Sequence, residues 1–187
     1  PDDSSAFKVS GDPTEIAYLI AAVKAGINIE ELNRQFPRLD EIPFESQIQM
    51  MATKNKSGES QSLICVKGAP EKIVELCGYY LKDGNVTELT DLLRKEILLI
   101  SERMAKDALR VLAFGIYEGD GLDKERFDWD ILKKKIVFAG LIGNIDPPRQ
   151  EAKEAIRICN NAGIKTIMIT GDHLSTAEAV ALELGMR

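Results

Sequence analysis

The sequence predicts an α/β fold in which a mainly antiparallel sheet is flanked by helices, followed by a short C-terminal run of alternating strands and helices. Apolar segments of strand length, such as residues 62–67 and 135–142, are separated by polar turns that contain glycine. In contrast, residues 90–109 repeat apolar side chains at helical spacing. After residue 145 the order becomes helix, apolar strand, helix. We therefore expect residues 1–145 to form one domain and residues 146–187 to be part of another.

The first elements are a helix pair. Pro13 presets the backbone of a first helical turn, and either Asp12 or Thr14 can cap its amide groups, so we expect a helix to begin here and to continue to Lys24. A second short helix is expected over residues 29–36, because Pro37 then stops it.

Next come an extended segment and a hairpin. Residues 42–44 and 50–53 are expected to be extended, and the polar stretch 54–60 separates the second of them from the apolar residues 62–67. The two apolar segments around the polar stretch predict a β-hairpin.

The next elements alternate. A helix is expected to begin at Pro70 and reach Cys77, and a turn is expected at residues 82–85. The amphipathic helix over 90–109 leads to strands at 111–117 and 135–142, with a charged loop between them. Beyond residue 145, helices at 149–162 and 176–184 enclose a strand at 164–169, an order typical of a parallel sheet.

Composition excludes several classes of protein. The 187 residues include 24 Lys and Arg against 30 Asp and Glu, a formal charge of −6 that disfavours nucleic acid as a partner. No apolar run approaches the roughly 20 residues that a membrane-spanning helix needs. The three cysteines lack CxxC spacing, which favours reduced thiols over disulfides or zinc. We expect a soluble piece of a longer chain.

Two motifs of the C-terminal part suit phosphate chemistry. Thr170, Gly171 and Asp172 follow an apolar strand, where a hydroxyl, backbone amides and a carboxylate could meet phosphate and magnesium. A turn with a helix cap explains the same residues. Asp146 and Arg149 flank two prolines and would make a stiff connector, or simply a helix start.

Three motifs of the first part suit a nucleotide. Lys67 and Gly68 lie at a strand end beside a small-residue turn that a ligand could approach closely. Phe44 could stack on a purine, and Arg110 could hold phosphate oxygens. Each residue also has an ordinary role in a core or on a surface. Signatures of Walker-type and Rossmann nucleotide binders do not occur.

Six motifs together resemble the nucleotide-binding domain of P-type cation-transporting ATPases, continuing into the phosphorylation domain. They are GDPTE at 11–15, IPF at 42–44, KGAPE at 67–71, LR at 109–110, DPPR at 146–149 and TGD at 170–172. The resemblance covers nearly the whole chain. It implies an α+β nucleotide-binding domain followed by part of a haloacid-dehalogenase-like domain.

The resemblance also implies residue roles. Glu15 would hydrogen-bond the adenine, Phe44 would stack on it, Lys67 and Gly68 would line the pocket, and Arg110 would meet the phosphates of ATP. Asp146, Arg149, Thr170, Gly171 and Asp172 would have supporting roles near the transferred phosphoryl group and its Mg²⁺, with no metal ligand assigned in this chain.

Two departures from the family pattern matter. Gln49 and Ser46 stand where basic residues are common, so ATP binding should be weak. No DKTGT segment with the phosphorylated aspartate occurs. We therefore expect the full-length protein to be a cation-translocating hydrolase at the cytoplasmic face of a membrane, with transmembrane, actuator and phosphorylation domains as partners, and this chain alone to be inactive.

Two alternatives remain open. A free-standing haloacid-dehalogenase-like phosphatase would use the DxD letters at Asp128 and Asp130, although these lie in a charged loop. A regulatory module that no longer binds nucleotide is favoured by Gln49 and Ser46.

Overall fold

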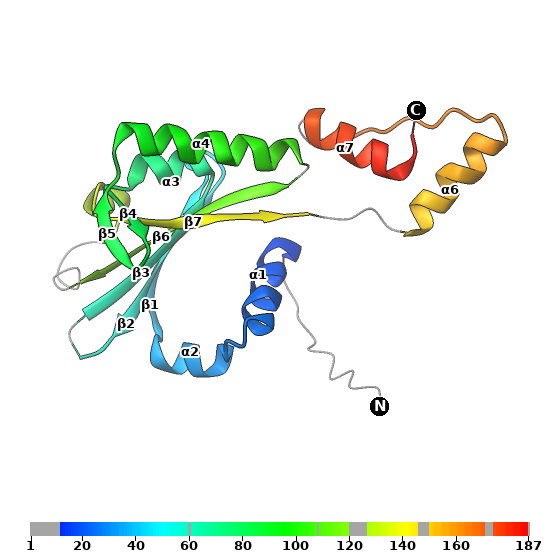
Figure 1. Cartoon of the computed structure of the whole chain (residues 1–187). Coiled ribbons are helices and arrows are strands. Elements are labelled where there is room, and N and C mark those ends of the chain that lie inside the picture. Colours follow the sequence, from blue (N-terminus) through cyan, green and yellow to red (C-terminus); the bar gives the residue numbers. More distant parts are fainter. Residues whose placement is uncertain are drawn as a thin grey trace.

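A computed structural model describes residues 12–59, 61–107, 109–119, 127–145, 150–170 and 174–186. Figure 1 shows the arrangement of the helices and strands. In chain order they are α1 (Pro13–Lys24), α2 (Ile29–Gln35), β1 (Arg38–Glu45), β2 (Met50–Ser57), β3 (Gln61–Gly68), α3 (Pro70–Leu76), β4 (Tyr79–Lys82), β5 (Asn85–Glu88), α4 (Asp91–Lys106), β6 (Arg110–Gly119), α5 (Trp129–Leu132), β7 (Val137–Asn144), α6 (Gln150–Asn161) and α7 (Leu174–Leu184).

The described strands form one seven-stranded sheet in the order β1-β2-β3-β6-β7-β4-β5. Neighbouring strands are antiparallel, except for β4 and β7, which are parallel. The predicted sheet, mainly antiparallel and flanked by helices, is therefore confirmed, including the hairpin of β2 and β3.

The register between β3 and β6 separates the two faces of the sheet. Val66 pairs with Gly115, and the next pair is Lys67 with Phe114. Because paired residues share a face and successive residues alternate, these two pairs point to opposite sides. Val66 is buried whereas Lys67 is only half-buried, so the first pair belongs to the core.

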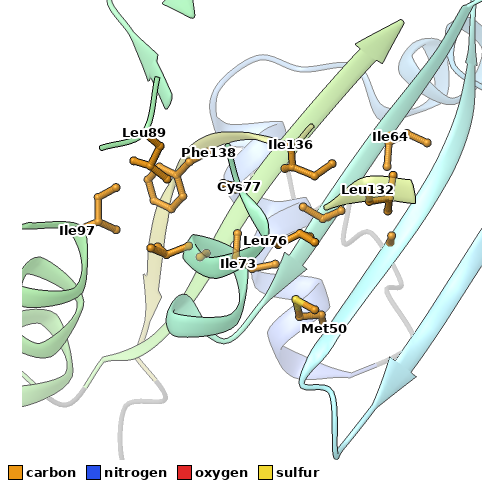
Figure 2. Close-up of a cluster of buried hydrophobic side chains, with 14 residues drawn as sticks. Met50, Ile64, Ile73, Leu76, Cys77, Leu89, Ile97, Leu132, Ile136 and Phe138 are labelled. Atoms are coloured by element: carbon orange, nitrogen blue, oxygen red, sulfur yellow. The ribbon is translucent and has the colours of Figure 1, made fainter. Parts of the chain in front are cut away.

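The hydrophobic core lies between one face of the sheet and helices α3 and α4 (Figure 2). Ile64, Ile73, Leu132 and Ile136 are fully enclosed there. Burying one such side chain contributes roughly 1.5–3 kcal/mol. Gly115 is needed at this layer, because a Cβ atom on it would lie 2.5 Å from Cγ2 of Ile136.

A partly buried arginine connects the two helices of this layer. Arg94 of α4 donates hydrogen bonds to the carbonyl oxygens of Val74 and Cys77 at the end of α3, the second of them over 2.7 Å. The last carbonyl groups of a helix have no hydrogen-bond donor within the helix, and here the guanidinium group of Arg94 is that donor.

Helix α1 lies on the other face of the sheet. Figure 1 shows α1 and α2 on the side away from α3 and α4. The ring of Tyr18 in α1 meets the ring of Phe114 in β6 edge to face, with centroids 5.3 Å apart. Residues of β3, β6 and β7 that point toward α1 are therefore available to line a site.

The hairpin of β4 and β5 was not predicted beyond its turn. Asp83 and Gly84 adopt positive φ of 49° and 79°, which suits the tight turn of a hairpin. β4 then lies beside β7 and gives the parallel pairing. Four-residue strands carry too short a pattern to be recognised in the sequence.

The C-terminal segment agrees with the prediction only in its helices. α6 and α7 form, but residues 164–170 are neither helix nor strand. Ile167 and Ile169 are 78% and 95% exposed. A strand needs a neighbouring strand for its backbone groups, and no described strand lies beside this segment. The predicted strand at 164–169 is therefore wrong for this structure, and the haloacid-dehalogenase-like arrangement stays a prediction.

Candidate functional site

The first turn of α1 supplies the predicted residue Glu15. Asp12 caps the helix, because its Oδ1 atom accepts a hydrogen bond from the backbone N–H of Thr14 over 2.8 Å. Hydrogen bonds from Thr14 lower the pKa of Asp12 and favour its charged form. A negative charge is stabilised at this end of a helix. The cap fixes where α1 begins and hence where Glu15 lies.

An irregularity in β1 turns Phe44 outward. The pairing of β1 with β2 shifts register between Ile42 and Glu45, and Phe44 lies within the shift. Its side chain is 58% exposed. Bulges of this kind re-aim side chains, and Pro43 beside it is tolerated because β1 is an edge strand. An aromatic ring with a free face results.

Lys67, near the end of β3, is held from two sides. Its Nζ atom pairs with both carboxylate oxygens of Glu15. It also lies 5.8 Å from the centre of the Tyr18 ring, within range of a cation–π interaction. The ammonium group is therefore fixed on the side of the sheet that faces α1.

Gly68 is required by a close approach of the backbone. A Cβ atom at this position would lie 2.3 Å from the carbonyl oxygen of Gln49. That oxygen accepts a hydrogen bond from the N–H of Ala69 over 3.0 Å, and Gln49 itself has a positive φ of 60°. The turn after β1 is thereby locked against the end of β3.

Five predicted residues come together around one cavity of roughly 440 Å³: Glu15, Phe44, Lys67, Gly68 and Arg110. Such a volume lies within the usual range of small-molecule sites, about 300–1,000 Å³. The remaining lining residues are Asp12, Thr14, Gln49, Met51, Ala69, Pro70, Glu71, Val111 and Leu112. The lining carries three carboxylates and two cations, so it attracts a polyanion only weakly.

Tyr18, whose ring lies beneath the ammonium group of Lys67, was not predicted from the sequence. Its position three residues after Glu15 places both on one side of α1, and that spacing was the available signal. Of the two residues that depart from the family pattern, Gln49 lines the cavity but Ser46 does not. The weakening effect of Gln49 on phosphate binding stays a prediction.

Of the predicted residues of the C-terminal part, the structure describes only Thr170, which does not line this cavity. Asp146, Arg149, Gly171 and Asp172 lie outside the described residues. Thr170 is described and exposed, at the end of segment 164–170. Their grouping near a phosphoryl group stays a prediction.

Asp128 has a structural role. Its Oδ1 atom accepts hydrogen bonds from the N–H groups of Asp130 and Ile131, over 3.1 and 3.3 Å, and so caps α5. The structure places Asp128 at the start of this short helix and not in a strand, where the nucleophile of such a phosphatase is expected. The geometry therefore does not favour the phosphatase alternative.

Two further properties of the described part of the chain bear on function. Its acidic, cysteine and histidine side chains form no group of three or more that could hold a metal ion. None of its helices combines the length and apolar character needed to cross a lipid bilayer.

Comparison with known proteins gives the family. A family model described as P-type ATPase, cytoplasmic domain N, matches residues 1–151. The chain is 41% identical to calcium-transporting ATPase 1 of Bacillus cereus over 177 aligned residues. The aligned residues make up 95% of this chain and 20% of that protein. The chain is 44% identical over 179 residues to cation-transporting ATPase pma1 of Synechocystis, covering 95% and 19% of the two chains.

A third relative is the probable cation-transporting ATPase F of Mycobacterium tuberculosis, 39% identical over 185 residues, covering 98% of this chain and 20% of that protein. The chain thus spans about a fifth of the length of these relatives. The family predicted from the six motifs is confirmed, and the chain belongs to the P-type cation-transporting ATPases.

Proposed function

We propose that this chain is the ATP-binding region of a P-type ATPase that couples ATP hydrolysis to cation transport across a membrane, and that ATP binds in the cavity between Phe44 and Lys67. One observation carries the proposal. Five residues chosen from the sequence, spread over α1, β1, β3 and β6, line a single cavity.

The adenine would occupy the end of the cavity at Phe44. The free face of this ring offers a stacking surface, and stacking of a base on an aromatic side chain contributes about 1–3 kcal/mol. Glu15 lines the cavity and pairs with Lys67. Its carboxylate can accept a hydrogen bond from the exocyclic amine of the adenine.

The phosphates would extend toward Arg110 at the start of β6. A guanidinium group binds phosphate oxygens in pairs, which fixes orientation as well as affinity. With Asp12, Glu15 and Glu71 also in the lining, the attraction for triphosphate is small. We therefore expect weak binding by this chain.

Magnesium would enter with ATP and neutralise phosphate charge. The described residues do not fit a metal site of their own. Residues 1–145 form the nucleotide-binding domain in this proposal. Residues 146–187 form part of the phosphorylation domain, in which Asp146, Arg149, Thr170, Gly171 and Asp172 support phosphoryl transfer by positioning and charge neutralisation.

The phosphorylated aspartate would come from sequence outside this chain, because no DKTGT segment occurs within it. The chain alone would bind ATP without hydrolysing it. In the whole protein it would lie at the cytoplasmic face of the membrane, with transmembrane, actuator and phosphorylation domains as its partners in one polypeptide.

Isothermal titration of ATP into the chain tests the proposal. Phe44→Ala should weaken binding about ten-fold, within the range of lost stacking energy. Tyr79→Ala is the matched control, because Tyr79 is an aromatic residue that is 44% exposed on β4 and does not line the cavity. Equal affinities of the wild type and Phe44→Ala would contradict the site, and a flat titration at millimolar ATP would favour the regulatory alternative.

A further inference from the structure

Two buried polar atoms lie behind the cavity without hydrogen bonds of normal geometry. They are the hydroxyl of Tyr18 and Nδ2 of Asn144. Buried polar atoms in native proteins nearly always have a partner, because an unpaired one keeps the full cost of its desolvation. Two such atoms on facing elements call for a common explanation.

The sheet register brings Asn144 to the side of β7 that faces α1. Asn144 pairs with Arg110 across β6 and β7, and Phe114 lies on the same face of β6, four residues from Arg110. The Tyr18 ring contacts Phe114. Tyr18 therefore reaches down from α1 onto the surface that carries Asn144.

The hydroxyl lies close enough to the carboxamide of Asn144 for the amide to influence its ionisation. The Asn144 amide lowers the pKa of Tyr18, although burial has the larger effect and raises it above the ordinary value. The hydroxyl is therefore protonated at neutral pH and can donate. Asn144 Nδ2 can only donate toward the phenolic oxygen, which is the effect that lowers the pKa of Tyr18. With the amide group rotated by 180°, its oxygen faces the hydroxyl and accepts a hydrogen bond from it instead.

The same ring supports the cavity on its other side. Lys67 Nζ lies over the Tyr18 ring at 5.8 Å while it pairs with Glu15. Tyr18 thus presents its ring to Lys67 and its hydroxyl toward Asn144 at the end of β7. β7 leads through Ile145 to the connector at residues 146–149 that the sequence predicts between the two domains.

We propose that Tyr18 is a positioning residue of the nucleotide site, which holds Lys67 with its ring and the end of β7 with a hydrogen bond to Asn144. This role rests on the proposed binding of ATP. Tyr18 would then connect Lys67 in the cavity wall with Asn144 at the end of β7, the strand that leads out of the domain. A ligand that displaces Lys67 would also displace the side chain of Asn144.

The hydrogen bond is tested without nucleotide, by thermal unfolding of Tyr18→Phe, Asn144→Leu and the double variant. Each single change leaves one buried polar group without its partner, and should lower the melting temperature by about 3 °C. The double variant removes both groups and should be about as stable as either single variant. Additive losses would show that the two side chains do not interact and would overturn this half of the proposal.

The effect on binding is tested by isothermal titration of ATP. Tyr18→Leu removes the cation–π contact and should weaken binding about three-fold, whereas Tyr18→Phe keeps the ring and should bind within about two-fold of the wild type. Tyr80→Leu is the control for a purely structural tyrosine, because Tyr80 packs on Phe138 in the core and does not line the cavity. It should lower stability without changing affinity.

Nuclear magnetic resonance completes the test. Addition of ATP should shift the side-chain amide signal of Asn144 in the wild type and shift it less in Tyr18→Phe. Wild-type affinity in Tyr18→Leu, or equal shifts in both proteins, would overturn the positioning role. A flat titration of the wild type would instead remove the proposed function, and with it this role in binding, while the unfolding cycle would still decide whether the contact exists.

Discussion

Glu15 and Lys67, 52 positions apart in the chain, form an ion pair that joins the first turn of α1 to the end of β3. The side chain of Lys67 is 20% exposed and that of Glu15 is 51% exposed. A partly shielded pair of this kind is screened less by water than a surface pair. It orders the cavity wall before any ligand enters, which is the condition for a preformed site.

Glu15→Gln should lower the free energy of unfolding by about 1 kcal/mol at low salt, because the ammonium of Lys67 loses its charged partner. The loss should be no larger, because the Glu15 side chain is half exposed to water. The loss should shrink in about 1 M salt, where the Debye length falls to roughly 3 Å. Urea unfolding at the two salt concentrations measures both values.

Glu30→Gln is the matched control. Glu30 pairs with Arg34 on the surface of α2, and both side chains are more than three-quarters exposed. This variant should change stability by at most about 0.5 kcal/mol. Equal effects of the two variants would mean that the Glu15 pair contributes no more than an ordinary surface pair.

Gly68→Ala should be strongly destabilising. The added Cβ atom would lie 2.3 Å from the Gln49 carbonyl oxygen and 2.9 Å from the Met50 Cα atom, and backbone atoms cannot move aside as a flexible side chain can. Overpacking of this kind costs roughly 1–3 kcal/mol. Urea unfolding measures the loss, and isothermal titration should show weaker ATP binding because the turn after β1 is displaced.

Gly58→Ala separates this steric clash from the effect of backbone conformation. Gly58 has a positive φ of 68°, yet nothing lies within 4 Å of a Cβ atom added there. It should cost about 1 kcal/mol and leave ATP affinity unchanged. If Gly68→Ala is no more damaging than Gly58→Ala, the close approach of the two backbones is not what makes glycine necessary.

The sequence was informative where a residue acts through its immediate neighbours. The start of α1 follows from Asp12 and Pro13, and the hairpin of β2 and β3 follows from two apolar segments around a polar turn. The cavity residues were predicted because they belong to motifs in a familiar order. Their assembly into one cavity depends on the sheet order, which no local pattern contains.

Features that depend on distant partners could not be predicted. The parallel pairing of β4 with β7 joins strands more than 50 residues apart in the chain. Gln49 adopts a positive φ at the end of the turn after β1, where its carbonyl oxygen lies close to Gly68, although glutamine itself has no preference for that conformation. Residues 164–169 show the converse case, a predicted strand that does not form. They have the composition of a strand, but a strand also needs a neighbouring strand to pair with its backbone groups.

The buried thiol of Cys77 should make the chain lose stability in alkali. Cys77 is fully buried, and burial raises its pKa from 9.0 to about 12, against the smaller opposing effects of Arg94 and Lys134. The folded state therefore holds this proton more tightly than the unfolded state does. The stabilisation is complete below the unfolded pKa of about 9 and is lost as the pH rises toward 12.

Between pH 8 and pH 10.5 this group should remove roughly 2 kcal/mol from the free energy of unfolding, because each unit of pKa difference is worth about 1.4 kcal/mol. Cys77→Ala lacks the thiol and should lose that much less over the same interval in urea unfolding. Val74→Ala is the control, since Val74 lies in the neighbouring α3 and is buried like Cys77 but does not ionise. It should lower stability equally at both pH values. If Cys77→Ala keeps the wild-type pH dependence, the thiol ionises as readily in the folded chain as in the unfolded one.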